Sequence, residues 1–367
     1  MESVFNTVPR TVCILRLSAI GDVCHVLPVV RTLQQAWPQT RFTWIIGRVE
    51  AKLLGHIPDI EFIALDKSST LRAYRTLRQA MRGRRFDVLM HMQLALRASV
   101  LSTLVPAHIK LGFDRARARE LQWLFTNRRI HPAERQHVMD SLFGFAERFQ
   151  VHDKLLRWDI PIPEAAQQYA RRVIPDGVRT LIISPCSSHQ LRNWRAEYYA
   201  QVGDYAAEAF GLRVVLCGGR SELERRMGAH IERLMKQPCV NTIGEDTLLE
   251  FLATLQRATV LLSPDSGPAH MATTVGTPVI GLYAATNPAR SGPYLSRQWC
   301  VDKYEAAAQR LLGQPASRLP WTTKIEKPGV MDLITPDDVI KKLNVLMQAL
   351  ARGARKGGTE GKGNAGG

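Results

Sequence analysis

Residues 258–283, ATVLLSPDSGPAHMATTVGTPVIGLY, indicate the fold class of this protein. The first apolar run, 260–262, is long enough for a buried strand, and the second, 279–283, is of the same kind. The small residues between them predict a short helix over about 268–275. Strand, loop, helix and strand in this order form the repeating part of a parallel α/β sheet.

The loop inside this unit has the chemistry of a nucleotide diphosphate site. Ser266 and Gly267 stand at the helix start, where free backbone N–H groups and the positive end of the helix dipole attract anions. His270 follows in the first turn and can reach a phosphate or a ribose. Asp265 can hold a ligand hydroxyl, or it can cap the helix. A helix cap without a ligand is the structural alternative.

The composition indicates a soluble globular protein of two domains. The chain has 367 residues and is 45% hydrophobic. No apolar run reaches the roughly 20 residues of a membrane span, and the N-terminus shows no secretory signal pattern. The 6 cysteines are scattered and form no C-x-x-C pair. We therefore expect buried free thiols in a reducing compartment, without a catalytic thiol among them.

The charge balance predicts an anionic partner. Lys and Arg number 49 against 33 Asp and Glu, a net charge of +16 that suits nucleic acid, a phospholipid surface or a phosphorylated substrate. Aromatic residues are only 7% of the chain, which does not favour nucleic acid. Residues 71–86, LRAYRTLRQAMRGRRF, predict a helix with many arginines and no acidic residue. We interpret it as a surface that faces an anion or a membrane, and a solvated helix face is the alternative.

The chain opens with another strand, loop and helix. Residues 11–17, TVCILRL, form an apolar run that precedes the loop containing Gly21. A G-x-G-x-x-G pattern is absent, which argues against an ordinary dinucleotide site. Asp22 lies at the end of this loop, near the start of the helix. It can serve as a helix cap or as a general base at the mouth of the sheet.

The same pattern recurs along the chain and restarts once. A connection rich in proline over 158–179 separates two halves, and a loop-rich stretch covers 284–330. Neither half contains a Walker A pattern, a zinc-spaced set of ligands or a convincing D-x-D at a strand end. Further strands are predicted at 42–46, 62–65, 87–92, 180–184, 213–217 and 240–244.

Five segments resemble, in the same order, a family of enzymes: the ADP-heptose:lipopolysaccharide heptosyltransferases and their relatives in glycosyltransferase family 9. The pattern is most similar to heptosyltransferase I, and the segments span most of residues 12–290. They are ILRLSAIGDVCHVLPVVRTL, HMQLALRAS, RELQWLFTNRRIH, SSHQLRNW and SPDSGPAHMATTVGTPVIGLYAATNP.

The resemblance implies an α/β protein of the GT-B fold, with two Rossmann-like doubly wound domains facing a central cleft. An acceptor-binding domain is expected over 1–165 and a nucleotide-sugar-binding domain over 166–335. A C-terminal helix over 336–351 is expected to pack back on the N-terminal domain. A disordered tail is expected over 352–367.

The resemblance also implies an activity. The expected reaction is inverting, metal-independent transfer of heptose from ADP-L-glycero-D-manno-heptose to the Kdo/inner core of lipopolysaccharide, without a cofactor. The expected partners are the nucleotide-sugar donor, an anionic Kdo-lipid A acceptor and the inner-membrane surface, with no nucleic acid. The protein would work in the cytoplasm, peripherally on the inner leaflet of the inner membrane of a Gram-negative bacterium.

Two alternatives to this activity stay open. The D-S-G-P-x-H form of the loop, with Pro268, occurs in the broader family, so the donor or the acceptor can be another one. The more distant alternative is a basic protein that binds anions without catalysis.

The resemblance assigns roles to individual residues. Asp22 matches the general base, and Arg192 matches a cation, usually lysine, beside the departing diphosphate. The positions that match donor-binding residues are Ser187, Ser188, Glu222, Asp265, Ser266, Gly267 and His270. The positions expected to bind the anionic acceptor are Arg97, Arg119, Arg72, Arg75 and Arg78.

Overall fold

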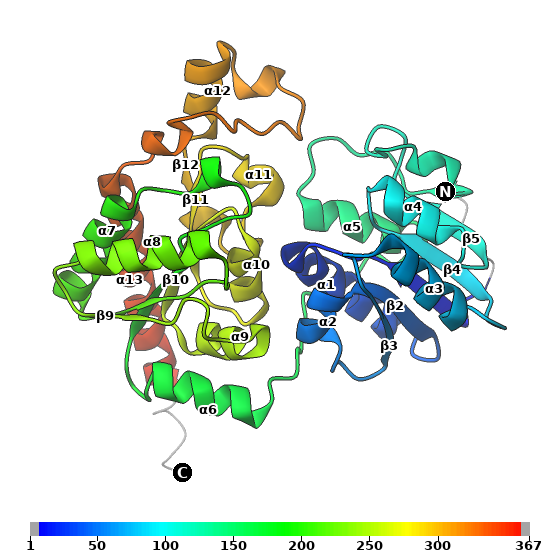
Figure 1. The fold of residues 1–367 in the computed structure, drawn as a ribbon, viewed down its shortest axis with the longest axis horizontal. Helices are drawn as coiled ribbons and strands as arrows, with labels where there is room; N and C mark the ends of the chain where they lie inside the picture. Colours follow the sequence, from blue (N-terminus) through cyan, green and yellow to red (C-terminus); the bar gives the residue numbers. More distant parts are fainter. Residues whose placement is uncertain (1–6, 361–367) are drawn as a thin grey trace. The chain divides into compact units, whose positions relative to one another are not determined.

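The computed structural model describes residues 7–360 and contains two compact units (Figure 1). The division falls between Glu164 and Ala165, one residue from the boundary expected from the sequence. Each unit has a parallel sheet of six strands and its own core, and each is described here by itself. None of the helices over residues 7–360 is long and apolar enough to cross a membrane.

The first unit has the strand order β3-β2-β1-β4-β5-β6. The order reverses between β1 and β4, and crevices at such switch points are where open parallel sheets bind ligands. Register pairs Leu15 of β1 with His91 of β4, so the loops that follow these two strands leave the sheet together. The strands are β1 (Thr11–Leu15), β2 (Arg41–Gly47), β3 (Ile60–Leu65), β4 (Phe86–His91), β5 (Ala107–Gly112) and β6 (Arg128–Arg129).

Helices cover both faces of this first sheet (Figure 1). The helix after β1 is buried along most of its length and contacts two of the others, α2 and α5. On the opposite face, α3 and α4 bury Leu77 and Leu101 in one cluster with the strands. The helices are α1 (Ile20–Ala36), α2 (Arg48–Leu54), α3 (Thr70–Ala80), α4 (Leu96–Ser102) and α5 (Val138–Glu147), with a short η1 (Gln122–Leu124).

The second unit repeats this topology, in the order β12-β11-β10-β7-β8-β9. Its switch point lies between β7 and β10, where Ile183 pairs with Leu262. The strand predicted over 279–283 has the same bounds in the structure. The strands are β7 (Thr180–Ile183), β8 (Arg213–Leu216), β9 (Cys239–Asn241), β10 (Val260–Pro264), β11 (Val279–Tyr283) and β12 (Val301–Asp302).

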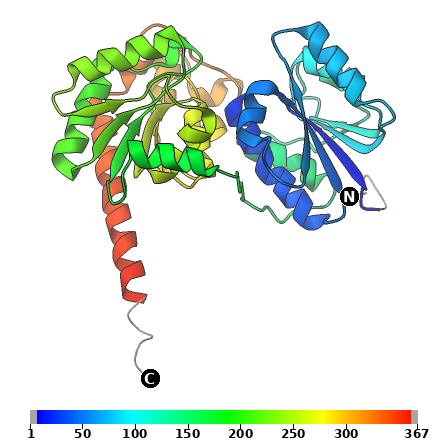
Figure 2. The ribbon, with the colours of Figure 1, turned by 60° about the horizontal axis from the view of Figure 1, so that its bottom comes forward.

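The helices of the second unit also lie on both faces of their sheet. On one face α7 packs with α8 and α13, and on the other α9 packs with α10 (Figure 1). Figure 2 shows α13 along the side of the unit, with its later turns extending past the sheet. The helices are α6 (Glu164–Val173), α7 (Ala196–Phe210), α8 (Glu222–Leu234), α9 (Leu248–Arg257), α10 (Gly267–Thr274), α11 (Pro288–Ser291), α12 (Tyr304–Leu312) and α13 (Pro336–Glu360).

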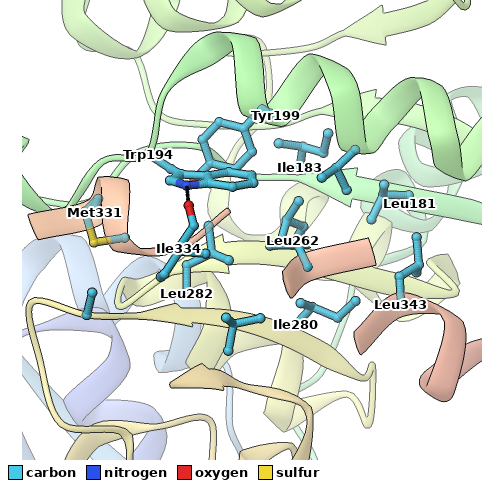
Figure 3. Packing of buried hydrophobic residues seen from close by; sticks show 14 of the residues in the cluster. Leu181, Ile183, Trp194, Tyr199, Leu262, Ile280, Leu282, Met331, Ile334 and Leu343 are labelled. Carbon is cyan, nitrogen blue, oxygen red and sulfur yellow. Dashed lines mark hydrogen bonds between the residues drawn. The ribbon is translucent and has the colours of Figure 1, made fainter. Parts of the chain in front are cut away.

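Trp194 is the central aromatic residue of the second core (Figure 3). It is 1% exposed and packs edge-to-face on Tyr199, with the ring centroids 5.1 Å apart. Its Nε1–H donates to the backbone carbonyl of Ile334 at 2.9 Å. Because a buried indole is held here at both ends, the loop that precedes it has a fixed position. That loop contains η2 (Gln190–Arg192).

Three expectations about local structure differ from the observed elements. The segment 158–179 is not only a connection, because it contains α6, whose Ala166, Ala170 and Val173 are buried at helical spacing. Its prolines lie outside the helix and obscured this periodicity. The stretch 284–330 is also more regular than expected, since α11, β12 and α12 lie within it. Besides β12, the strands β5 and β6 were also not predicted.

The C-terminal helix belongs to the second core. Val339, Leu343 and Leu346 of α13 are buried there. The expectation that this helix packs on the N-terminal domain concerns the relation between the two units and stays a prediction. The helix continues to Glu360, beyond the end expected at 351. The rest of the expected tail, 361–367, lies outside the described residues.

Candidate active-site residues in the two units

In the first unit, Asp22 lies in the first turn of α1, directly after β1. Its Oδ2 accepts a hydrogen bond from the Ala19 N–H at 3.0 Å and lies 2.5 Å from Nη2 of Arg16. The Asp22 side chain is 34% exposed, whereas that of Arg16 is 10% exposed. The carboxylate therefore has a helix-capping contact and still reaches solvent, so the capping and catalytic interpretations are compatible.

Arg16 is a site residue that the sequence reasoning missed. Besides Asp22, its guanidinium donates to two carbonyl oxygens, from Nε to Ser18 at 2.8 Å and from Nη1 to Met92 at 2.5 Å. It thus ties the loop after β1 to the loop after β4. The signal was present, because an arginine at the end of an otherwise apolar strand needs such partners.

Two glutamines fix the same loops from within. Oε1 of Gln93 accepts the N–H groups of Leu17 and Ser18 at 3.0 and 3.3 Å. The fully buried Gln122 donates from Nε2 to the carbonyls of His91 and Gln93 at 2.8 and 3.1 Å. The segments HMQLALRAS and RELQWLFTNRRIH therefore provide a frame for the loop that carries Asp22.

Arg97 lies at the start of α4, on the edge of the first sheet where the strands end. Its Nη1 donates to the Lys67 carbonyl at 2.5 Å, while its Nε is buried without a hydrogen-bond partner among residues 7–360. Lys67 in turn binds Glu50, with Nζ 2.6 Å from Oε1. Glu50 is almost fully buried, and neither it nor Lys67 was anticipated from the sequence.

The other basic residues expected on the acceptor side are exposed. Arg119 lies between β5 and η1, in a segment without regular structure. Arg72, Arg75 and Arg78 lie on the outer side of α3, while Ala73 and Leu77 are buried beneath them. Arg72 is 3.9 Å from the carboxylate of Asp66. The structure thus separates Arg97, at the sheet edge, from the three α3 arginines on a helix surface.

In the second unit, the loop between β10 and α10 presents an uncapped helix start. Ser266 is the N-cap residue of α10, but its side chain makes no capping hydrogen bond. Its hydroxyl lies 2.8 Å from the hydroxyl of Ser263 instead. Gly267 begins the helix, and Pro268 adds no donor there. The backbone N–H groups of the first turn therefore have no side-chain cap, as an anion site requires.

Asp265 belongs to a group of polar side chains beside the helix start. Its Oδ1 is 3.9 Å from Nε2 of His270, and its Oδ2 is 3.8 Å from Nη1 of Arg192. Ser291 donates from Oγ to Oδ2 at 3.3 Å. The structure thus brings together three of the predicted residues, Asp265, His270 and Arg192, each with a side chain at most 13% exposed.

Glu326 completes this group and was not anticipated. Its Oε1 accepts from Nε of Arg192 at 2.8 Å and from Nη2 at 2.5 Å. Its Oε2 lies 3.7 Å from Nε2 of His189. Partial burial alone would raise the pKa of Glu326, but Arg192, His189 and Lys324 together outweigh this and lower it. Because Arg192 and Glu326 are 134 residues apart along the chain, the sequence did not indicate that they pair.

Ser187 and Ser188 lie in the loop after β7. The Ser187 hydroxyl donates to the His189 carbonyl at 3.0 Å and accepts from the His189 N–H at 3.2 Å, so it forms a local turn. The backbone N–H of Ser187 donates to Asn193 at 2.8 Å. Ser188 is exposed. The segment SSHQLRNW is therefore an ordered loop with one hydroxyl engaged and one at the surface.

Glu222 lies at the start of α8, after β8. Its Oε1 accepts from Nε of Arg226 at 2.7 Å, and its side chain is 68% exposed. Because β7 lies between β8 and β10 in the sheet, Glu222 is set apart from the group around Arg192 along the same edge.

Asp246 is a further perturbed group in this unit, in the turn after β9. Burial, and next the charge of Glu250, raise the pKa of Asp246 to about 7. Its Oδ2 is buried without a hydrogen-bond partner among the described residues. Such groups are often found near ligand sites, although the sequence pattern gave no signal for this one.

The cysteines confirm the expectation of free thiols. All are unpaired, and Cys239 is half-buried while the others are buried. Burial is the largest cause that raises the pKa to about 12 for four of them: Cys24, Cys186, Cys217 and Cys300. Such thiols are poor nucleophiles at neutral pH. Within residues 7–360, no group of three or more His, Cys, Asp or Glu side chains is placed to hold a metal ion.

Comparison with known proteins identifies the family. The model of glycosyltransferase family 9 (heptosyltransferase) matches residues 74–318. The chain is 40% identical over 342 residues to the lipopolysaccharide core heptosyltransferase OpsX of Haemophilus influenzae, covering 93% of this chain and 98% of that protein.

Two solved structures show the same fold. The glycosyl transferase family 9 protein from Veillonella parvula has a TM-score of 0.76 at 21% identity, covering 93% of this chain and 97% of that one. The E. coli heptosyltransferase WaaC with ADP has a TM-score of 0.70 at 20% identity, covering 92% and 99%. The chain therefore belongs to glycosyltransferase family 9, and it is a glycosyl-transferring enzyme with the two Rossmann-like units of the GT-B fold.

Proposed function

We propose that this enzyme transfers heptose from ADP-L-glycero-D-manno-heptose to the Kdo/inner core of lipopolysaccharide. The observation that carries the catalytic part is Asp22, a solvent-reaching carboxylate held by Arg16 at the switch point of the first sheet. The choice of sugar and acceptor is supported by the 40% identical relative, a lipopolysaccharide core heptosyltransferase. Family membership disfavours the alternative of a non-catalytic basic protein.

The donor would lie along the carboxyl edge of the second sheet. The uncapped N–H groups at the start of α10, the Arg192 cation and the His270 imidazole suit a diphosphate. Asp265, beside both side chains, would accept from a sugar hydroxyl. Ser187 and Ser188 would contact the phosphates from the loop after β7. The exposed carboxylate of Glu222 would accept from the ribose hydroxyls.

The transfer would be a single displacement. Asp22 takes the proton from an acceptor hydroxyl as that oxygen attacks the anomeric carbon from the face opposite the leaving diphosphate, which inverts the configuration. The bond from the anomeric carbon to the diphosphate oxygen breaks, and negative charge develops on the ADP product. Arg192 and the α10 N-terminus would stabilise that charge. In this mechanism protein groups supply the positive charge, so the reaction needs neither a metal ion nor a cofactor.

The acceptor would bind through basic residues of the first unit. Arg97 at the sheet edge and the exposed Arg119 suit the carboxylates of Kdo. Arg72, Arg75 and Arg78 on α3 suit anionic headgroups around the lipid A part. An anionic acceptor gives the net charge of +16 a specific interpretation, and it fits a protein working peripherally on the cytoplasmic leaflet of the inner membrane.

Nucleotide binding and transfer test this proposal together. Calorimetry with ADP, UDP and GDP is expected to show selective ADP binding in both the wild type and Asp22→Asn. Transfer from ADP-heptose to Kdo-lipid A is expected in the wild type, and to fall by about 100-fold to 10,000-fold in Asp22→Asn, because a general base is lost. Asp59→Asn is the matched control, since Asp59 is exposed and its positive φ of 65° is one that Asn tolerates.

Two results would change the assignment. Preference for UDP or GDP would move the enzyme to the alternative of another nucleotide sugar within the same family. Full transfer activity in Asp22→Asn would remove Asp22 from the role of base.

A further inference from the structure

Residues 323–334 form a strap that returns from α12 to the carboxyl edge of the second sheet. The Ile325 side chain is 1% exposed, and its N–H donates to the Ala285 carbonyl just after β11 at 2.7 Å. The Tyr304 hydroxyl donates to the Thr323 carbonyl at 3.0 Å. The strap therefore has a fixed path over this edge, although the family model ends before it, at residue 318.

The strap holds three residues of the segment 192–195. Trp194 donates to the Ile334 carbonyl at 2.9 Å (Figure 3). Arg195 makes a two-pronged ion pair with Asp332, at 2.6 and 2.7 Å. Arg192 makes its two hydrogen bonds to Glu326. The first two contacts hold the side chains of Trp194 and Arg195. The third holds the side chain of Arg192, which is proposed to bind the diphosphate.

The geometry of the third contact occupies one edge of the guanidinium and leaves Nη1 with only a longer contact to Asp265. Glu326 engages Nε and Nη2 of Arg192, and Nη1 is directed toward Asp265 at 3.8 Å. A guanidinium has five N–H donors in a fixed plane, so a carboxylate on one edge sets the direction of the other. Arg192 is 11% exposed and Glu326 is 23% exposed, so the pair is largely shielded from water.

We infer that Glu326 is a positioning residue, which holds the Arg192 guanidinium so that Nη1 faces the diphosphate of the donor. The inference rests on the proposed function, because it assigns Arg192 to the diphosphate. A cation fixed before the ligand arrives does not have to be ordered during the reaction, and this is how preorganised sites stabilise developing charge. The partner carboxylate also offsets the cost of keeping this cation nearly buried.

A double-mutant cycle tests this inference. The proteins are the wild type, Glu326→Gln, Arg192→Ala and the double variant, and calorimetry measures their affinities for ADP and AMP. Glu326→Gln is expected to weaken ADP binding about tenfold, the effect of one hydrogen bond to a charged group, and to leave AMP binding unchanged. In the Arg192→Ala background the same change is expected to have no further effect, because Glu326 acts through Arg192.

Two further variants separate positioning from stability. Glu326→Asp keeps the charge and is expected to recover part of the ADP affinity. Asp332→Asn breaks the other ion pair of the strap, away from Arg192, and is expected to lower stability without changing the ratio of ADP to AMP affinity. The kcat of transfer is expected to fall in Glu326→Gln more than KM for the acceptor rises.

The outcomes are distinct. Additive effects of the two substitutions on ADP affinity would overturn the inference, and so would tighter ADP binding in Glu326→Gln, which would mean that Glu326 competes with the diphosphate. If the wild type prefers another nucleoside diphosphate, the donor assignment fails. The same cycle with that nucleotide and its monophosphate would still decide the role of Glu326.

Discussion

Nη2 of Arg16 lies 2.5 Å from Oδ2 of Asp22, and the same guanidinium donates to the Met92 carbonyl. The candidate base is thus connected through one side chain to the loops of both central strands, β1 and β4. An aspartate at a helix start can rotate, and this contact restricts it to one orientation. We therefore propose that the candidate base and Arg16 act as one functional unit.

The first prediction concerns this pair. Arg16→Met keeps the apolar stem of the side chain but removes the donors to Ser18, Met92 and Asp22. We expect a loss of about 1–3 kcal/mol in the free energy of unfolding, because a largely buried carbonyl loses its donor. We also expect kcat to fall by at least about tenfold. Denaturant unfolding and transfer kinetics measure the two effects.

Arg16→Lys serves as the control for Arg16→Met. It retains the positive charge but has no planar set of donors. It should recover part of the stability and less of kcat. Normal kcat in both variants would show that Asp22 does not depend on Arg16 for its orientation.

The second prediction concerns pH. The pKa of Asp246 is raised to about 7, chiefly by burial and next by Glu250, so the folded state keeps its proton at pH values where the unfolded chain has lost it. Proton binding by folded Asp246 therefore contributes to the free energy of unfolding. This contribution is fully present below pH 4 and is lost as the pH rises to about 7, at about 1.4 kcal/mol for each pH unit. Asp246→Asn removes the loss, so the variant should gain stability over the wild type between pH 5 and pH 8.

Denaturant unfolding at these two pH values tests the second prediction. The exposed Asp153, substituted in the same way, is the control. An equal difference between Asp246→Asn and the wild type at pH 5 and pH 8 would contradict the assignment of a raised pKa.

The third prediction concerns Trp194, which anchors the loop that carries Arg192. Trp194→Phe preserves an aromatic ring against Tyr199 but leaves the Ile334 carbonyl without its donor. We expect the free energy of unfolding to fall by about 1–3 kcal/mol, in the range for a buried acceptor left unpaired. ADP affinity should fall as well, because Arg192 lies two residues away in the same loop. Calorimetric unfolding and ADP titration measure these effects, and an unchanged unfolding temperature would contradict the role of this hydrogen bond.

The fourth prediction concerns the exposed arginines of α3. Replacement of Arg72, Arg75 and Arg78 by Ser should weaken binding to vesicles of phosphatidylglycerol by about 1 kcal/mol for each charge removed. Binding of ADP should not change, because the donor residues belong to the other unit. Co-sedimentation with vesicles measures the first effect, and calorimetry measures the second.

A matched control for the fourth prediction removes the same charge from the second unit. Arg233, Arg310 and Arg318 are exposed there, and their replacement by Ser should leave vesicle binding nearly unchanged. Equal losses in the two triple variants would mean that only the net charge matters. A loss of ADP affinity in the α3 variant would contradict its role as an acceptor or membrane surface.

The sequence alone predicted much of the loop between β10 and α10 and of the first strand–helix unit. The strand over 279–283 was predicted with its observed bounds. Asp22 lies near the helix start after β1, Asp265 directly follows β10 and His270 lies in the first turn of α10, as expected. These features depend on apolar runs and on glycine and proline beside them, which are local in sequence. The family resemblance rested on the same local segments, and the comparisons confirm it.

The local sequence pattern did not predict two elements whose structure depends on packing against neighbouring segments. β5 does alternate, with Ala107, Ile109 and Leu111 on one side and His108 and Lys110 on the other, but the pattern covers too few residues to stand out, and β4 and β6 pair with this segment to make it a strand. The helix α6 has only alanines and one valine on its buried face, too weak a pattern to stand out between prolines. In both cases tertiary contacts supplied what the segment alone did not.

The sequence by itself thus determined two doubly wound halves, the positions of their ligand loops and the residue types able to hold a diphosphate and remove a proton. Only the tertiary structure decided which side chains hold these groups in place. Arg192 and Glu326 are 134 residues apart and meet because the strap crosses the sheet edge, and Arg16 meets Asp22 through the turn after β1. Strand runs and loop chemistry are encoded over a few neighbouring residues, whereas the partner of a buried charge depends on how the whole chain packs.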